Sequence, residues 1–212
     1  GNVHASLQKT DIAVWRPWVD YPIQLQSGIG DAEADLHFSK LAIDAIDADV
    51  EFQHLSIGHP NKSKPLIASK LQGFLGWKKG NHTETITLKE FNLALNTGLV
   101  VESANGEWVS TIKKNKPWID AYLSVQSLHM SKVAEAAEYF ALSPTWINWI
   151  AGVSPNGNIK GLKTAVSGHP DTLQNYSASA EFEQLGIQAF NQVPGFSNLS
   201  GSIDLNERKG EV

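Results

Sequence analysis

Acidic side chains gather in one short stretch of the sequence, between residues 44 and 51. Paired carboxylates are the groups that general acid–base catalysis uses, and clusters of carboxylate oxygens bind Ca²⁺. Here the carboxylates alternate with apolar residues, which puts Asp47, Asp49 and Glu51 on one face of a β-strand and the apolar side chains on the other. We therefore interpret the acidic group as the solvated face of a strand, not as a catalytic or cation site.

The remaining residues that could do chemistry form no motif. The seven histidines are scattered singly, without the H-x-x-x-H or H-E-x-x-H spacing of zinc sites. The chain has no Cys and no G-x-S-x-G or G-x-x-x-x-G-K-[ST] motif, and Gly28-Ile29-Gly30 lacks the third glycine of a dinucleotide-binding loop. The sequence therefore predicts a protein without enzymatic activity, metal site or cofactor.

Tryptophan occurs twice as W-x-x-W, at Trp15/Trp18 and at Trp146/Trp149. A spacing of three residues puts both indoles on one face of a helix. With Phe140, these side chains are candidates for a helical plug or an interface. An indole has an apolar body and one polar N–H, so contact with lipid and stacking on a sugar or a protein partner are alternatives to simple packing.

The two W-x-x-W motifs lie in segments that interrupt a β pattern. Residues 10–19 can begin as a helix capped by Thr10 or Asp11, and residues 131–152 read as two amphipathic helices divided at Ser143-Pro144. We expect these short helices to cap the sheet beneath them.

Composition excludes several classes of protein. The 17 basic and 22 acidic residues give a net charge of −5, and no basic stripe interleaved with aromatic residues is present, so a nucleic-acid partner is not expected. No apolar run reaches the roughly 18 to 20 residues that span a bilayer. Zero Cys suits an oxidising compartment.

Most of the chain alternates with a period of two residues, which is typical of β-strands. Strands are predicted at these ranges: 32–38, 44–52, 71–78, 83–95, 108–113, 119–128, 159–167, 176–182 and 199–205. Turns are expected at Gly80-Asn81 and Asn105-Gly106. The predicted fold is mainly β (α+β): long antiparallel strands in a curved, groove-like sheet capped by short helices.

A pattern near Phe52 recurs 130 positions later, near Phe182. The sequence A-x-x-E-F-x-x-L-x-I begins at Ala48 and again at Ala178, and in both copies the apolar phase shifts after the Phe, which predicts a shared β-bulge. Together with weaker echoes on either side, this pattern predicts two related repeats, 1–115 and 116–212, in one continuous elongated unit.

Three stretches of the chain resemble the YhdP branch of the AsmA-like proteins of the Gram-negative envelope. These are the run from Thr10 to Pro22, the Ser27–Asp31 segment followed by the 47–52 strand, and the run from Trp146 to Gly157. The resemblance implies a segment of a large periplasmic protein that is anchored in the inner membrane by a helix absent from this chain. It also implies neighbouring repeats in a larger parent chain, and a bridge-like groove that shields the acyl chains of phospholipid between the two membranes.

The apolar positions of the alternating strands are the candidate groove lining. They combine small and medium side chains with a few large ones: Leu36, Phe38, Ile46, Ala48, Val50, Phe52, Ala178, Ala180 and Phe182. Such a face must be covered by a second layer or by a hydrophobic ligand. The alternatives are a self-closed structural or adaptor module that binds an envelope protein, and a glycan-binding or glycan-acting domain.

Overall fold

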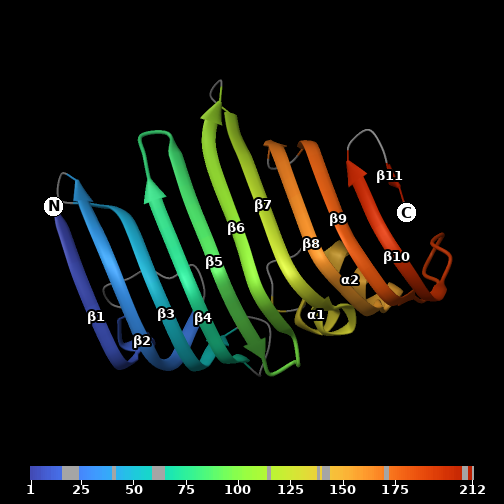
Figure 1. Cartoon of the computed structure of the whole chain (residues 1–212), viewed down its shortest axis with the longest axis horizontal. Coiled ribbons are helices and arrows are strands. Elements are labelled where there is room, and N and C mark those ends of the chain that lie inside the picture. The colour runs from blue at the N-terminus through green and yellow to red at the C-terminus, as the bar shows by residue number, and fades with distance from the viewer. Residues whose placement is uncertain are drawn as a thin grey trace.

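One antiparallel sheet makes up most of the molecule, and its strands follow one another in chain order (Figure 1). The computed structural model describes residues 1–15, 24–39, 42–58, 65–113, 116–137, 139, 144–169, 172–206 and 210–211. The eleven strands are β1 (Asn2–Asp11), β2 (Gln24–Ser39), β3 (Ala42–Gly58), β4 (Leu66–Lys79), β5 (Thr83–Leu95), β6 (Val100–Lys113), β7 (Lys116–His129), β8 (Asn156–His169), β9 (Thr172–Ile187), β10 (Phe196–Asn206) and β11 (Gly210–Glu211). The predicted fold class is confirmed.

Most strands are longer than the alternating segments of the sequence suggest, and β5 alone spans its predicted range. The expected turn at Gly80-Asn81 is confirmed, since it joins β4 to β5. The expected turn at Asn105-Gly106 is wrong, because both residues lie inside β6 and pair with Ser124 and Leu123 of β7. A Cβ added to Gly106 would lie 2.9 Å from the Tyr122 carbonyl oxygen, so this glycine permits close approach of two strands.

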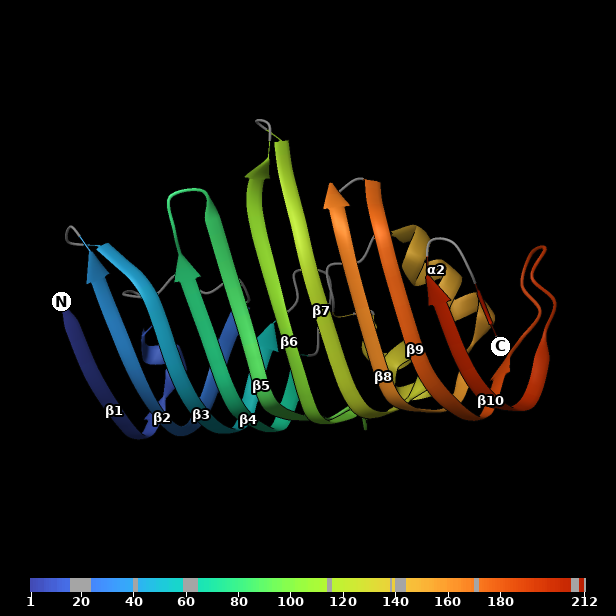
Figure 2. The ribbon, with the colours of Figure 1, turned by 45° about the horizontal axis from the view of Figure 1, so that its top comes forward.

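The sheet bends along a line that crosses most of its strands. Figure 2 shows the lower ends of the strands turning back behind the sheet, on the side where the helices lie. Along this line exposed residues other than glycine adopt positive φ: Lys9, His54, Glu90, Ser103, Gln184 and Asn198. The strand registers shift beside them, as β-bulges require. A bulge adds one residue to one strand and bends it, so the bend is encoded strand by strand.

The predicted phase shift is part of this bend. His54 has φ of 53° and Gln184 has φ of 52°, and each follows its Phe by two residues. The equivalent local conformation explains why the apolar phase shifts in both copies of the pattern. The division into two repeats at residue 115 stays a prediction.

Within the described residues, three short helices lie between strands. The 3₁₀ helix η1 (Ile12–Trp15) follows β1, and α1 (Met130–Ala137) and α2 (Pro144–Val153) link β7 to β8. Of the two predicted helix caps, Asp11 is confirmed, since its Oδ1 accepts the Ala13 N–H at 3.0 Å and the Gly28 N–H at 3.1 Å. Thr10 is not the cap, because it pairs with Gly30 as part of β1.

The main core lies on the inner side of the bend. Its members are buried apolar residues of β3, β4, β5, the turn after β5, and α1: Leu55, Leu66, Ala68, Leu95, Leu99 and Ala136. Ile12 of η1 and Val133 of α1 pack against it. The residues of the bend that are buried are therefore apolar and face inward, while the polar bulge residues face outward, so the apolar face of the sheet is its concave face.

Candidate functional site

Apolar residues cross the concave face in continuous rows, one residue per strand. The first row runs from β1 to β9: Val3, Leu36, Ile46, Trp77, Ile86, Trp108, Ala121, Val166 and Tyr176. The second row runs from β1 to β10: Ala5, Ala34, Ala48, Leu75, Leu88, Gly106, Leu123, Thr164, Ala178 and Leu205. Thr164 and Tyr176 carry the side-chain hydroxyls in these two rows. We call the concave face that these rows line the groove.

The predicted lining residues fall on this face. Leu36 and Ile46 belong to the first row, and Ala48 and Ala178 to the second. Val50 pairs with Ala32 and Gly73 one step nearer the bend. Toward the other end of the strands, Phe38 pairs with Ile43, and in the C-terminal half Ala180 pairs with Ile203.

The two phenylalanines of the repeated pattern lie deeper than the other lining residues. Phe52 is 3% exposed and Phe182 is 8% exposed, because both sit where the strands bend. They form the floor of the groove, packed against protein. Their burial makes them structural residues whose loss would also disturb folding.

The part of the groove that lies away from the bend is open. Ile86 is 40% exposed, Leu123 is 38% exposed and Val3 is 50% exposed. Among the described elements, η1 and α1 pack on the core near the bend, and α2 is tied to the chain after β9 by the bond from Gln188 N–H to the Val153 carbonyl, 2.7 Å. The apolar side chains of the groove are therefore half-exposed away from the bend, whereas short helices pack beside the groove at the bend.

One polar pair lies at the upper edge of the groove. The Trp77 indole N–H donates to Glu84 Oε1 at 2.8 Å, across the β4–β5 hairpin. The hydrogen bond satisfies the only polar atom of the indole, so the Trp77 ring presents its apolar body to the groove.

The convex face carries the polar positions of the same strands, as predicted. Carboxylates of β2 and β3 lie directly opposite one another in the pairs Asp31/Glu51, Glu33/Asp49 and Asp35/Asp47. Like charges placed directly opposite in a sheet are destabilising, and full solvent exposure reduces the cost. Within the described part of the chain, no three His, Asp or Glu residues are placed to hold a metal ion.

The predicted helical plug is described only in part. Trp18 and Phe140 lie outside the described residues. Trp15 ends η1 and Trp146 lies in α2. Trp149, also in α2, is 40% exposed. No helix of the described residues has the length and apolar character that crossing a membrane requires.

Several lining residues escaped the sequence analysis, among them Trp77, Ile86, Trp108 and Leu123. They show the same alternation as the residues that were found, so periodicity alone could have identified them. Their alignment into rows depends on the registers of ten strands, which the bulges set.

Comparison with known proteins gives one family. The family model described as YhdP protein matches residues 1–212. No curated protein and no solved structure matches the chain.

Proposed function

Because the chain belongs to the YhdP family, which ties it to lipid transport in the cell envelope, we propose that it is a non-enzymatic segment of a lipid conduit. Its groove shields the acyl chains of phospholipid from water in the periplasm, between the inner and outer membranes. Neighbouring repeats of a larger parent chain would continue the sheet at its edges.

A single observation carries this proposal: the apolar rows cross the sheet, interrupted at Thr164, and stay half-exposed away from the bend. A water-facing apolar surface of this extent marks a binding site. The second row crosses ten strands, and nine strand spacings of about 4.8 Å give a groove roughly 43 Å long. Half of a hydrocarbon core of about 30 Å, the reach of one acyl chain, is about 15 Å. The groove is thus long enough to cover a lipid lying along it.

The energy of such binding is large enough to matter. Each methylene moved from water into an apolar site contributes about 0.8 kcal/mol, so a dozen methylenes contribute roughly 10 kcal/mol before ordering costs. Small side chains such as Ala34, Ala48 and Ala178 leave space above the sheet for a slim chain. No catalytic group is needed for this task.

The main alternative is a self-closed structural or adaptor module. It requires the chain's own helices to cover the apolar face. The described helices pack on the core around Leu55 and leave Ile86 and Leu123 half-exposed, which supports the conduit over the closed module.

Native mass spectrometry after purification from a bacterial envelope tests the proposal. The unsubstituted protein should retain phospholipid. The Ile86→Glu variant should lose it, because burying a carboxylate beside acyl chains in the groove would cost too much desolvation energy. Thr87→Glu places the same charge on the convex face and is the matched control, so it should keep its lipid. An unsubstituted protein free of lipid, or equal loading of the two variants, would overturn the proposal.

A further inference from the structure

The convex face is polar over most of its area, but between β6 and β9 it holds a shallow hollow of about 330 Å³. Val109, Tyr122 and Ala165 are among its apolar lining residues, and Asp120 and Asn175 are among its polar ones. The register places Val109, Asp120 and Asn175 in one row across the strands, and Tyr122 and Ala165 in the next. These side chains therefore belong to the face opposite the groove.

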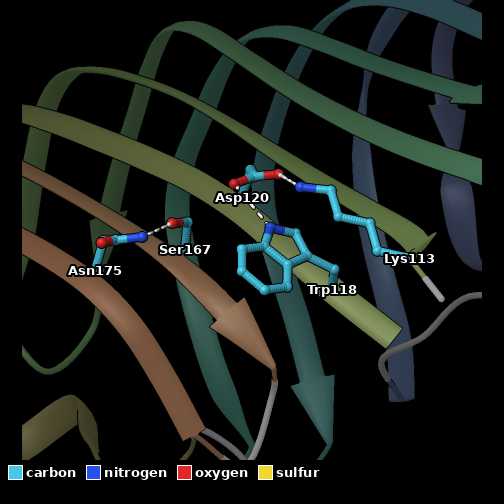
Figure 3. A network of polar contacts seen from close by, with 5 residues as sticks. All are labelled: Lys113, Trp118, Asp120, Ser167 and Asn175. Carbon is cyan, nitrogen blue, oxygen red and sulfur yellow. Dashed lines mark hydrogen bonds and ion pairs between the residues drawn. The ribbon is translucent and has the colours of Figure 1, made fainter. Parts of the chain in front are cut away.

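Hydrogen bonds fix the polar groups around this hollow. Asp120 accepts the Trp118 indole N–H at 3.1 Å and the Lys113 Nζ at 3.3 Å, and Lys113 Nζ lies 4.3 Å from the centre of the Trp118 ring. On the neighbouring strands, the Asn175 amide donates to Ser167 Oγ at 2.9 Å. Figure 3 shows Asp120 held between Lys113 and Trp118, with the Ser167–Asn175 pair beside them. The sheet thus holds a carboxylate and an amide in fixed positions beside an aromatic ring.

We propose that this hollow binds a saccharide, with one pyranose ring stacked on Tyr122. The Tyr122 side chain is 49% exposed, so its ring is available to the apolar C–H face of a sugar. Asp120 offers acceptors, Asn175 offers both donors and acceptors, and Ser167 offers a hydroxyl. Sugar hydroxyls are donors and acceptors at once, and they match this mixture.

Other ligand classes fit the same groups less well. An anion would meet the carboxylates of Asp120 and Glu107, which also lines the hollow. A purely apolar ligand would desolvate those carboxylates without replacing their hydrogen bonds. A cation would use the carboxylates and Tyr122 but would make no use of the second Asn175 N–H, the one that is not bonded to Ser167.

The size and shape of the hollow indicate the form of the ligand. A volume of about 330 Å³ is near the lower limit of ligand pockets, which hold roughly 300 to 1,000 Å³, so it accommodates about one ring. Because the hollow is shallow and crosses several strands, the ring would belong to a glycan chain lying over the sheet. This site lies on the face opposite the groove and does not depend on the proposed lipid conduit.

Titration of the whole chain with chitotetraose and cellotetraose, followed by ¹H–¹⁵N NMR, tests the inference. At least one oligosaccharide should shift the Trp118 indole N–H signal saturably. Tyr122→Ala should weaken that binding by at least about tenfold, and Tyr122→Phe, which keeps the ring, should largely preserve it. Thr87→Ala, on the convex face outside the hollow, should bind like the parent.

Three results would overturn the inference. The first is the absence of any saturable shift with either oligosaccharide. The second is equal affinity of the parent and Tyr122→Ala for the sugar. The third is a response of the Trp118 signal to tetralysine and not to the sugars, which would assign the hollow to a basic peptide. A folded ¹H–¹⁵N spectrum of Tyr122→Ala is the control that separates loss of sugar binding from loss of structure.

Discussion

At the scale of single residues, the bend of the sheet depends on backbone conformations that most side chains avoid. His54 and Gln184 occupy the left-handed region, with φ of 53° and 52°. For an L-residue this conformation costs about 1 to 2 kcal/mol, and for a β-branched residue it is strongly disfavoured. Hydrogen bonds to the neighbouring strands must offset that cost. Substitutions at these two positions therefore test whether the bend is formed as described.

The first prediction concerns the bulge at His54. His54→Val should lower the free energy of unfolding by about 1 to 2 kcal/mol, whereas His54→Gly should not lower it, because glycine adopts positive φ without strain. Urea denaturation measures both. Gln53→Val, one residue earlier in extended backbone on the convex face, is the control and should have little effect. Equal effects of valine at the two positions would contradict the bulge.

The second prediction separates the core from the open groove. Leu55 is 4% exposed, whereas Leu199 of β10, which pairs with Leu185 on the concave face, is 45% exposed. Leu55→Ala should cost about 2 to 5 kcal/mol of stability, because it leaves a cavity under α1, and Leu199→Ala should cost less than about 1 kcal/mol. Chemical denaturation of the two variants tests this, and similar losses at both sites would show that the groove is closed where the structure shows it open.

At the scale of elements, periodicity predicted the strands, and the errors arose where a local signal conflicts with long-range pairing. Asn105-Gly106 has the composition of a turn, yet Asn105 Oδ1 accepts the Glu90 N–H at 3.0 Å and Gly106 lies between two strands. Thr10 has the composition of a helix cap, yet it extends β1 beside Gly30. Ladder hydrogen bonds decided both cases, and a single sequence does not reveal which strands pair.

The candidate site, too, was predicted from periodicity only in part. Alternation assigned Ile46, Ala48 and Val50 to the apolar face correctly. It could not show that Phe52 and Phe182 are buried in the floor while Ile86 and Leu123 remain accessible, because depth depends on the bend and on where α1 packs. The period of a pattern predicts which face of a strand is apolar, but it does not predict whether another element covers that face.

The third prediction concerns the attachment of α2. In a helix, replacing glycine by alanine ordinarily stabilises by about 1 kcal/mol. Gly152 is an exception, because a Cβ there would overlap the ring of Phe190. Gly152→Ala should therefore lower the melting temperature and speed hydrogen exchange at the Gln188 N–H, which bonds to Val153. Thr145→Ala, at an exposed position of α2, should not; a rise in melting temperature for Gly152→Ala would refute the contact.

At the scale of the whole molecule, the described residues leave the sheet open along part of its concave face and at both edges. The edge strands β1 and β10 have one neighbouring long strand each, and β11 covers only the end of β10. An open edge can pair with another strand. The apolar rows reach both edges, through Val3 and Ala5 on β1 and Leu205 on β10, so a strand added at either edge could extend the groove without changing its geometry.

Site-specific photocrosslinking to radiolabelled phospholipid tests whether lipid lies on the concave face. A benzophenone amino acid would be placed in turn at Thr85, Ile86, Thr87 and Leu88 of β5. Ile86 and Leu88 face the groove, and Thr85 and Thr87 face outward, so the account predicts labelling at every second position. Labelling at all four positions, at none, or at Thr85 and Thr87 alone would contradict it.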